Sequence, residues 1–183
     1  MSASSIIAVR LAGVVLLSLA LACEPERSPT APADPRASTL QDLADAQPGT
    51  PIPIAGTFNL TFQPTAAQQA DGNTFIDFSF HEELSGSVSG TRDGTGTLTI
   101  HPDGTLNVTD TGFLTGTLGA VSGSVNAEVW AVGTLASIAG SVTIYPATGT
   151  GGFAGLQGVV KVTGAATGPT TLTGSYEGQV HFP

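Results

Sequence analysis

The sequence predicts an all-β protein whose main domain is a closed antiparallel barrel of about eight strands. Charged residues make up only 10% of the 183 residues, while glycine occurs 24 times and proline 12 times. Such a composition argues against a helical bundle, which favours Glu, Lys, Arg, Leu and Ala at helical spacing. Short runs alternate apolar with polar residues and are separated by turn signals, which is typical of short strands. A β-sandwich is the alternative.

Residues 1–22 are predicted to be a signal peptide. Arg10 precedes a twelve-residue apolar run, Leu11 to Ala22, which ends in small residues. A membrane-spanning helix needs roughly 20 apolar residues, so this run is too short to remain as a span. One basic residue followed by a short apolar run is typical of an export signal. We therefore expect a protein of the cell envelope or a secreted protein, and not a cytoplasmic one.

Cys23 is the only cysteine of the chain and directly follows Leu19-Ala20-Leu21-Ala22. This segment resembles the lipobox of bacterial lipoproteins, in which the cysteine thiol is joined to diacylglycerol and the signal is cut just before it. That family usually has Leu where this chain has Ala20. The alternative is plain signal-peptidase cleavage after Ala22, but a lone exported cysteine has no disulfide partner, which favours lipidation.

The lipobox resemblance implies a membrane anchor through Cys23. In enteric lipoproteins an Asp after the cysteine favours retention in the inner membrane, and this chain has Glu24 at that place. The outer membrane or outer surface is therefore the expected location.

Residues 23–54 are predicted to be a flexible tether. This stretch contains seven of the twelve prolines and few large apolar side chains. Such a composition buries too little apolar surface to offset the entropy lost on ordering.

Residues 55–183 are predicted to form the barrel. Alternation with period two gives each strand one dry face and one polar face. The runs carrying it are 57–62, 76–81, 97–100, 105–108, 142–144, 159–163 and 180–182. Turn signals separate them, among them Arg92-Asp93-Gly94 and the hairpin signal His101-Pro102-Asp103-Gly104. Closing the sheet removes exposed edges, which favours a barrel.

The net charge of the chain is −9. Within residues 55–183 the basic residues are Arg92 and Lys161 against nine acidic ones, so 2 − 9 = −7. With so few basic residues, the domain has no positively charged surface that could bind the phosphates of nucleic acid. We therefore expect no nucleic-acid partner.

The glycine-rich segment Gly149 to Gly158, the following strand and the segment Gly174-Ser175-Tyr176-Glu177-Gly178 resemble the C-terminal part of allene oxide cyclase-like barrels. That group includes plant allene oxide cyclases, dirigent proteins and bacterial secreted proteins. The resemblance covers roughly residues 55–183 and rests mainly on glycines, so it implies the fold. In the plant members activity depends on polar groups at the barrel mouth that match no position here, and the cyclase cysteine has no counterpart in residues 55–183. Trimers among the plant members imply a homo-oligomer, for which Trp130 is the candidate contact.

No metal site and no cofactor are expected. His81, His101 and His181 occur singly on different predicted elements. A zinc site requires several ligands brought together, and no Cys is left in residues 55–183 to join them. A serine hydrolase is also unsupported, because no G-x-S-x-G segment lies between a strand and a helix.

Two carboxylates are the candidate catalytic residues. Glu82 continues the face of Phe78 and Phe80 and is therefore predicted to point into the barrel. Glu128 lies next to Trp130, on the face opposite the apolar positions of its strand. A carboxylate inside an apolar lumen would have a raised pKa and would suit acid–base chemistry. For both residues a position at a strand end or in solvent is the alternative.

Three other polar residues, Arg92, Tyr145 and Tyr176, are candidates for lining a ligand site in the lumen.

The export signal, the tether and the lack of a catalytic constellation favour an exported barrel that binds a small apolar ligand or a protein partner over an enzyme. A cyclase or isomerase acting on a hydrophobic substrate is the first alternative. A structural or adhesive envelope protein is the second.

Overall fold

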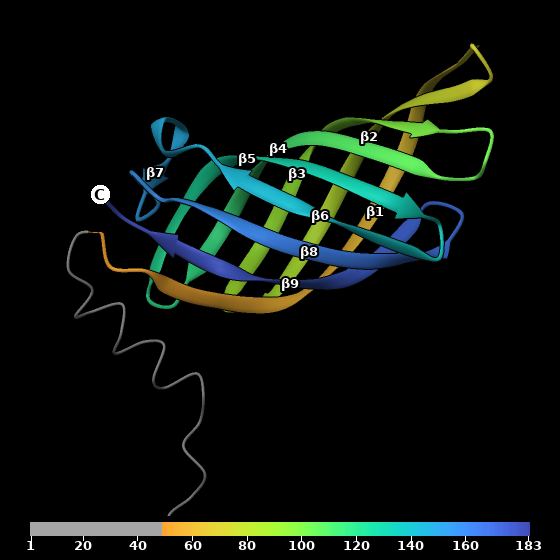
Figure 1. Cartoon of the computed structure of the whole chain (residues 1–183). Helices are drawn as coiled ribbons and strands as arrows, with labels where there is room; N and C mark the ends of the chain where they lie inside the picture. The colour runs from red at the N-terminus through yellow and green to blue at the C-terminus, as the bar shows by residue number, and fades with distance from the viewer. Residues whose placement is uncertain (1–48) are drawn as a thin grey trace, which may run out of the picture. The chain divides into compact units, whose positions relative to one another are not determined.

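The computed structural model describes residues 49–183, drawn in colour in Figure 1. The predicted signal peptide, the lipidation candidate Cys23 and the predicted tether up to residue 48 lie outside the described residues. No helix in residues 49–183 has the length and apolar character that a membrane crossing requires.

The described residues form strands and one 3-10 helical turn. In chain order these are β1 (Ile52–Ala70), β2 (Asn73–Gly86), β3 (Val88–Ile100), β4 (Leu106–Leu118), β5 (Val121–Thr134), β6 (Ser137–Ile144), η1 (Pro146–Thr148), β7 (Thr150–Gly151), β8 (Gln157–Gly168) and β9 (Thr171–His181). β7 has only two residues, which pair with β5.

The eight long strands close into an antiparallel barrel, which confirms the predicted fold. They follow the order β4-β3-β2-β1-β9-β8-β6-β5, and β4 also pairs with β5. All these pairings are antiparallel, and closure leaves none of the long strands at an open edge (Figure 1). The sandwich alternative is therefore excluded.

Strand β1 begins at Ile52, before the predicted domain boundary at residue 55. Ile52 and Ile54 are buried and pair with Val180 and Gly178 of β9. Pairing with β2 starts only at Gly56, so β1 has a single neighbour over these first residues. A proline is tolerated where a strand has one free side, which explains Pro53 inside β1.

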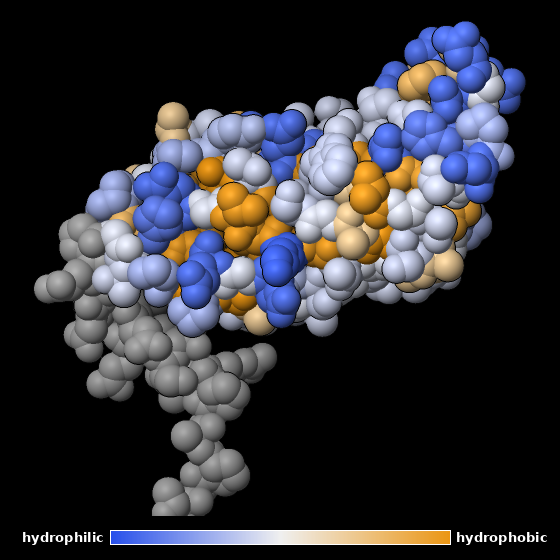
Figure 2. Space-filling view, viewed as in Figure 1, coloured by the Kyte–Doolittle hydropathy of each residue, from blue (hydrophilic) through white to orange (hydrophobic). Residues whose placement is uncertain are grey.

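The β1–β2 hairpin extends beyond the barrel (Figure 1). Residues 63–70 of β1 are exposed, and the register of the pair shifts between Pro64 and Ala66. Asp71, at the tip, has a positive φ of 51°. Figure 2 shows this extension as largely hydrophilic, while the barrel face in the same view mixes apolar and polar residues.

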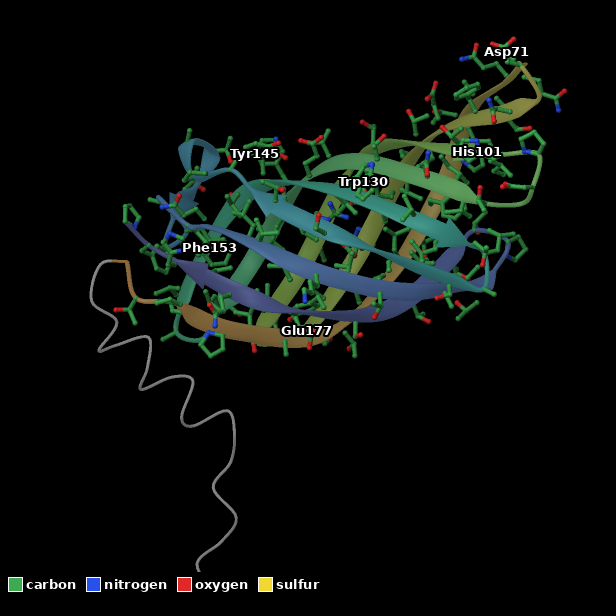
Figure 3. All side chains as sticks on the ribbon, in the orientation of Figure 1. Asp71, His101, Trp130, Tyr145, Phe153 and Glu177 are labelled. Carbon is green, nitrogen blue, oxygen red and sulfur yellow. The ribbon has the colours of Figure 1, made fainter. Side chains whose placement is uncertain are left out.

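The core fills the barrel with side chains from alternate strand positions. One cluster of buried apolar residues lies at the end that carries Phe153 and Leu156, and two further clusters fill the rest. Phe153 is fully buried and Leu156 nearly so, so the segment between β7 and β8 closes this end of the barrel (Figure 3).

One predicted turn does not exist. β3 runs without interruption from Val88 to Ile100, through the segment Arg92-Asp93-Gly94. Gly94 stands opposite Phe80 of β2 in the pairing, in the middle of the sheet. A Cβ on Gly94 would collide with the Thr111 carbonyl oxygen, so this glycine allows β3 and β4 to approach closely. The pair Asp93-Gly94 nevertheless has the same composition as a turn.

Candidate functional site

Three charged side chains meet inside the barrel, on the neighbouring strands β2, β3 and β4. Glu82, Arg92 and Asp110 are 7%, 4% and 6% exposed. Arg92 donates from Nε to Glu82 Oε2 at 2.6 Å and from Nη1 to Asp110 Oδ1 at 2.6 Å. The guanidinium therefore lies between two carboxylates, and we call these three residues the charged cluster.

Strand register explains the geometry of the charged cluster. Glu82 stands directly opposite Arg92 in the β2–β3 pair. On β4, however, Arg92 pairs with Leu114, four residues beyond Asp110. The arginine side chain therefore runs along the barrel to reach Asp110, and its Cζ lies 4.6 Å from the centre of the Phe80 ring. A guanidinium over an aromatic face gains a favourable cation–π contact.

Two inward glycines leave space beside the charged cluster. A Cβ on Gly96 would lie 2.6 Å from both Asp110 Cβ and Phe78 Cζ. A Cβ on Gly112 would lie 2.8 Å from Phe80 Cζ. The absence of a side chain at these positions allows the two phenylalanine rings and Asp110 to share one level of a narrow barrel.

Two cavities of unequal size lie in the lumen. The larger has a volume of ≈ 120 Å³, and we call it the open-end cavity. The smaller, of ≈ 60 Å³, is lined by Phe153 and Leu156 at the closed end. Glu82 and Arg92 line both cavities, whereas Asp110 lines only the larger of these two. The charged cluster therefore lies between the two apolar spaces and forms a polar floor to the open-end cavity.

The walls of the open-end cavity are mainly apolar. Its aromatic members are Phe58, Phe62 and Phe78, and the ring centres of Phe62 and Phe78 lie 5.6 Å apart. Leu135, which is 60% exposed, also lines this cavity. The cavity therefore reaches the molecular surface near the turn between β5 and β6.

Burial and charge act in opposite directions within the charged cluster. Burial disfavours the charge of Arg92, but Glu82 and Asp110 outweigh this effect and raise the pKa of the guanidinium further. For Asp110 the balance is reversed. Burial raises the pKa of this carboxyl above its usual value, because the attraction and hydrogen bond of Arg92 only partly compensate for lost hydration.

The charged cluster retains hydrogen-bonding capacity. Glu82 Oε1, Asp110 Oδ2 and Arg92 Nη2 have no hydrogen-bond partner among the described residues. In the same part of the chain, no side-chain nitrogen or oxygen is both fully buried and without a partner. These three atoms must therefore keep some exposure, and all three residues line the open-end cavity.

The structure divides the residues that the sequence singled out. Glu82, Arg92 and Tyr176 point into the lumen, and Tyr176 lines the smaller cavity. Glu128 is exposed on the outer face of β5. Tyr145 also lies outside the lumen, where its hydroxyl donates to Glu128 and its pKa is raised by that hydrogen bond. Tyr145 follows the buried Ile144, so strand alternation turns its side chain outward.

Tyr176 joins the start of β3 to β9. Its hydroxyl donates to the Val88 carbonyl at 3.0 Å and accepts from the Val88 amide at 3.0 Å. Burial raises the pKa of this phenol. The contacts indicate a structural role at the closed end of the barrel.

Sequence reasoning missed Asp110. A signal was present, because Leu106, Val108 and Asp110 alternate along one strand face as Phe78, Phe80 and Glu82 do. The two carboxylates were therefore recognisable as inward positions, but their contact with Arg92 depends on the order of the strands.

In the part of the chain that the structure describes, the histidines and the other carboxylates form no comparable site. Within residues 49–183 no group of three or more His, Cys, Asp or Glu side chains is placed to hold a metal ion. His81 bonds to Asp93 at 2.6 Å on the outer face, and His101 bonds to Asn73 at 2.8 Å. Trp130 is 55% exposed, and the self-association predicted for it stays a prediction.

Comparison with known proteins gives a family and a solved structure. Residues 54–176 match the model of the family described as "Protein of unknown function (DUF3224)". A crystal structure of a DUF3224 protein of unknown function from Shewanella oneidensis MR-1 is similar, with a TM-score of 0.61 at 16% sequence identity. The alignment covers 73% of this chain and 98% of the Shewanella chain, and at this identity it shows a shared fold. The comparison with curated proteins gave no match. Because the family model spans most of the barrel, this chain belongs to the DUF3224 family.

Proposed function

We propose that the protein is an exported lipoprotein whose barrel binds one small, mainly apolar ligand in the open-end cavity. The observation that carries the proposal is a cavity of ≈ 120 Å³ with apolar walls, a polar floor and a lining residue, Leu135, that is exposed to solvent. Ligand sites typically combine apolar walls with a few polar groups that fix orientation.

The volume limits the size of the ligand. An engineered apolar cavity of about 150 Å³ in a lysozyme binds benzene. The open-end cavity of ≈ 120 Å³ therefore suits one ring or a short chain, and it is too small for a sterol or a long fatty acid. Toluene is a suitable first probe.

The test is toluene binding to the purified full chain, measured by calorimetry and thermal shift. Val108→Phe places a ring in the open-end cavity, and Val159→Phe makes the same change at a position that is 60% exposed on the outside of β8. We expect Val108→Phe to weaken toluene binding by about tenfold or more, since a filled cavity has no room for the ligand. We expect Val159→Phe to have no effect.

Binding of toluene that is unchanged by Val108→Phe would contradict the proposed site. Absence of binding to the unmodified chain would also contradict it. Ala131→Leu, which fills the same cavity from β5, provides a second variant if Val108→Phe does not fold.

The export part of the proposal rests on residues 1–22 and Cys23 of the sequence. Mass spectrometry of the mature amino terminus is expected to find an acylated Cys23, and Cys23→Ser is expected to release the protein from the membrane fraction. A mature terminus at Cys23 without acyl groups would support plain secretion instead.

Proton transfer on the bound ligand is a second candidate function, favoured by the raised pKa of Asp110 beside an apolar cavity. A carboxyl whose pKa is raised holds its proton to a higher pH than a hydrated carboxyl does, which suits general acid–base chemistry. Deuterium exchange next to the carbonyl of cyclohexanone is expected with the full chain and not with Asp110→Asn. Equal exchange by both proteins would contradict this role.

A further inference from the structure

We infer that the ligand of the open-end cavity is a small apolar amine, whose protonated amino group binds to the free carboxylate oxygens of Glu82 and Asp110. This inference rests on the proposed function, because it names the ligand class of the same site. It goes further by assigning the charge of the ligand.

The first argument is charge balance. With all three groups ionised, the charged cluster carries two negative charges and one positive charge. Arg92 already donates to both carboxylates, so a carboxylate ligand would bring a third negative charge into a buried space around one arginine. An ammonium group instead supplies the positive charge that the charged cluster lacks.

The second argument is the set of free atoms. Glu82 Oε1 and Asp110 Oδ2 are acceptors without a partner among the described residues, on side chains that are 9% and 4% exposed. A protonated amine has three donors, and ionised donors form the stronger hydrogen bonds. The raised pKa of Asp110 is consistent with this, because it reflects a carboxylate that lacks compensating positive charge.

The third argument is the cavity wall. Phe58, Phe62 and Phe78 line the open-end cavity together with both carboxylates. Aromatic faces attract cations, and aromatic cages are a recurrent way to bind ammonium groups. The described part of the chain also has a net charge of −7, which favours the approach of a cation over that of an anion.

The test is a ligand series in which one ring carries four different groups. Toluene, benzyl alcohol, benzylamine and benzoate are titrated into the purified full chain by calorimetry at about neutral pH, where alkylamines are protonated. We expect benzylamine to bind about tenfold or more tightly than benzyl alcohol, because it adds charged hydrogen bonds. Toluene is expected to bind more weakly than benzyl alcohol, and benzoate to bind weakest.

Variants locate the effect. Asp110→Asn and Glu82→Gln are each expected to reduce benzylamine affinity about tenfold and to change toluene affinity by much less, because toluene has no charge for the carboxylates to bind. Asp77→Asn is the matched control, since it removes the same charge from an exposed position on β2. If Asp110→Asn does not fold, Glu82→Gln and the ligand series on the unmodified chain still test the inference.

Acidity provides an independent measurement. Asp110 faces Arg92 and Glu82 in the charged cluster, and the negative charge of Glu128 on β5 also raises the pKa of Asp110. Protonating Asp110 removes a negative charge, so benzylamine affinity is expected to fall as the pH is lowered, while toluene affinity is not.

The outcomes separate the two claims. If toluene binds and benzyl alcohol or benzoate binds as tightly as benzylamine, the amine inference is overturned and the proposed function stands. If none of the four compounds binds, both are overturned. Benzylamine affinity that is reduced equally by Asp77→Asn and Asp110→Asn would indicate general electrostatics and would also overturn the inference.

Discussion

Arg92 donates from Nε to Glu82 Oε2 at 2.6 Å, across the strand pair in which the two residues stand directly opposite. This pair, completed by Asp110, replaces the apolar packing that fills most of the lumen. A buried ion pair is a weak source of net stability, because lost hydration cancels much of the attraction between the charges. Its presence in the floor of a cavity therefore favours a role in binding over a role in folding.

The charged cluster depends on its arginine. Arg92→Met is expected to destabilise the protein by about 3–5 kcal/mol, because it leaves two carboxylates buried without a positive partner. Urea unfolding at neutral pH measures this change. The deficit is expected to shrink at acidic pH, where protonation of Asp110 removes one of the buried negative charges.

A matched variant separates charge from packing. Replacing all three residues at once, Glu82→Leu with Arg92→Met and Asp110→Leu, is expected to leave stability within about 1 kcal/mol of the natural chain or above it. A loss in this variant as large as in Arg92→Met alone would show that cavity creation, and not unpaired charge, causes the destabilisation.

Asp110 should make folding depend on pH. Its pKa is raised in the folded protein, so the folded state holds the proton more tightly than the unfolded chain does. The stability that this proton adds is fully present below the pKa of an Asp in the unfolded chain, about 3.9. It is lost as the pH rises through the pKa of Asp110 in the folded protein. Asp110→Asn is therefore expected to lack this loss and to be at least as stable near neutral pH.

Unfolding free energies of both proteins across a pH series test this expectation. His81, whose pKa is raised by Asp93, contributes equally to the two curves, so it cancels in their difference. Parallel curves for the natural chain and Asp110→Asn would contradict the raised pKa.

The sequence predicted some residues of the charged cluster and of the lumen correctly and others wrongly. Period-two alternation correctly placed Glu82 in the lumen, and the predicted total of about eight strands agrees with the eight long strands, although one predicted turn is false. Arg92 lines the lumen, as its place among the candidate residues predicted, but the turn predicted at Arg92-Asp93-Gly94 is wrong because this segment lies within β3. The contact of Arg92 with Asp110 depends on strand register, which one sequence does not fix. Tyr145 lies outside the lumen although it was a candidate for lining it, and alternation from the buried Ile144 accounts for its outward direction.

Tyr176 is expected to stabilise the closed end. Tyr176→Phe removes a hydroxyl that bonds to both the amide and the carbonyl of Val88, and it should cost about 1–3 kcal/mol. Tyr145→Phe is the control, because it removes a hydroxyl on the outer face and should change stability by about 0.5 kcal/mol or less. Equal losses by chemical denaturation would argue against a structural role for the Val88 contact.

Gly96 is expected to tolerate no side chain. In Gly96→Ala the new Cβ would lie 2.6 Å from Asp110 Cβ, Phe78 Cζ and the Thr109 carbonyl oxygen. We expect a loss of about 1–3 kcal/mol and a displaced Asp110, because overpacking forces neighbours to move. Thr95→Ala, the neighbouring outward position, should have little effect on thermal stability. A Gly96→Ala protein of unchanged stability would show that the barrel wall yields more easily than the contacts indicate.

The most direct test of the central claim is an NMR titration of the isotope-labelled full chain with toluene, followed by measurement of contacts between toluene protons and protein methyl groups. A ligand in the open-end cavity predicts contacts with Leu98, Val108 and Val162, which line it, and none with Val159 on the outer face. Toluene that contacts only outer methyl groups, or none, would contradict the claim that this barrel holds a ligand in its lumen.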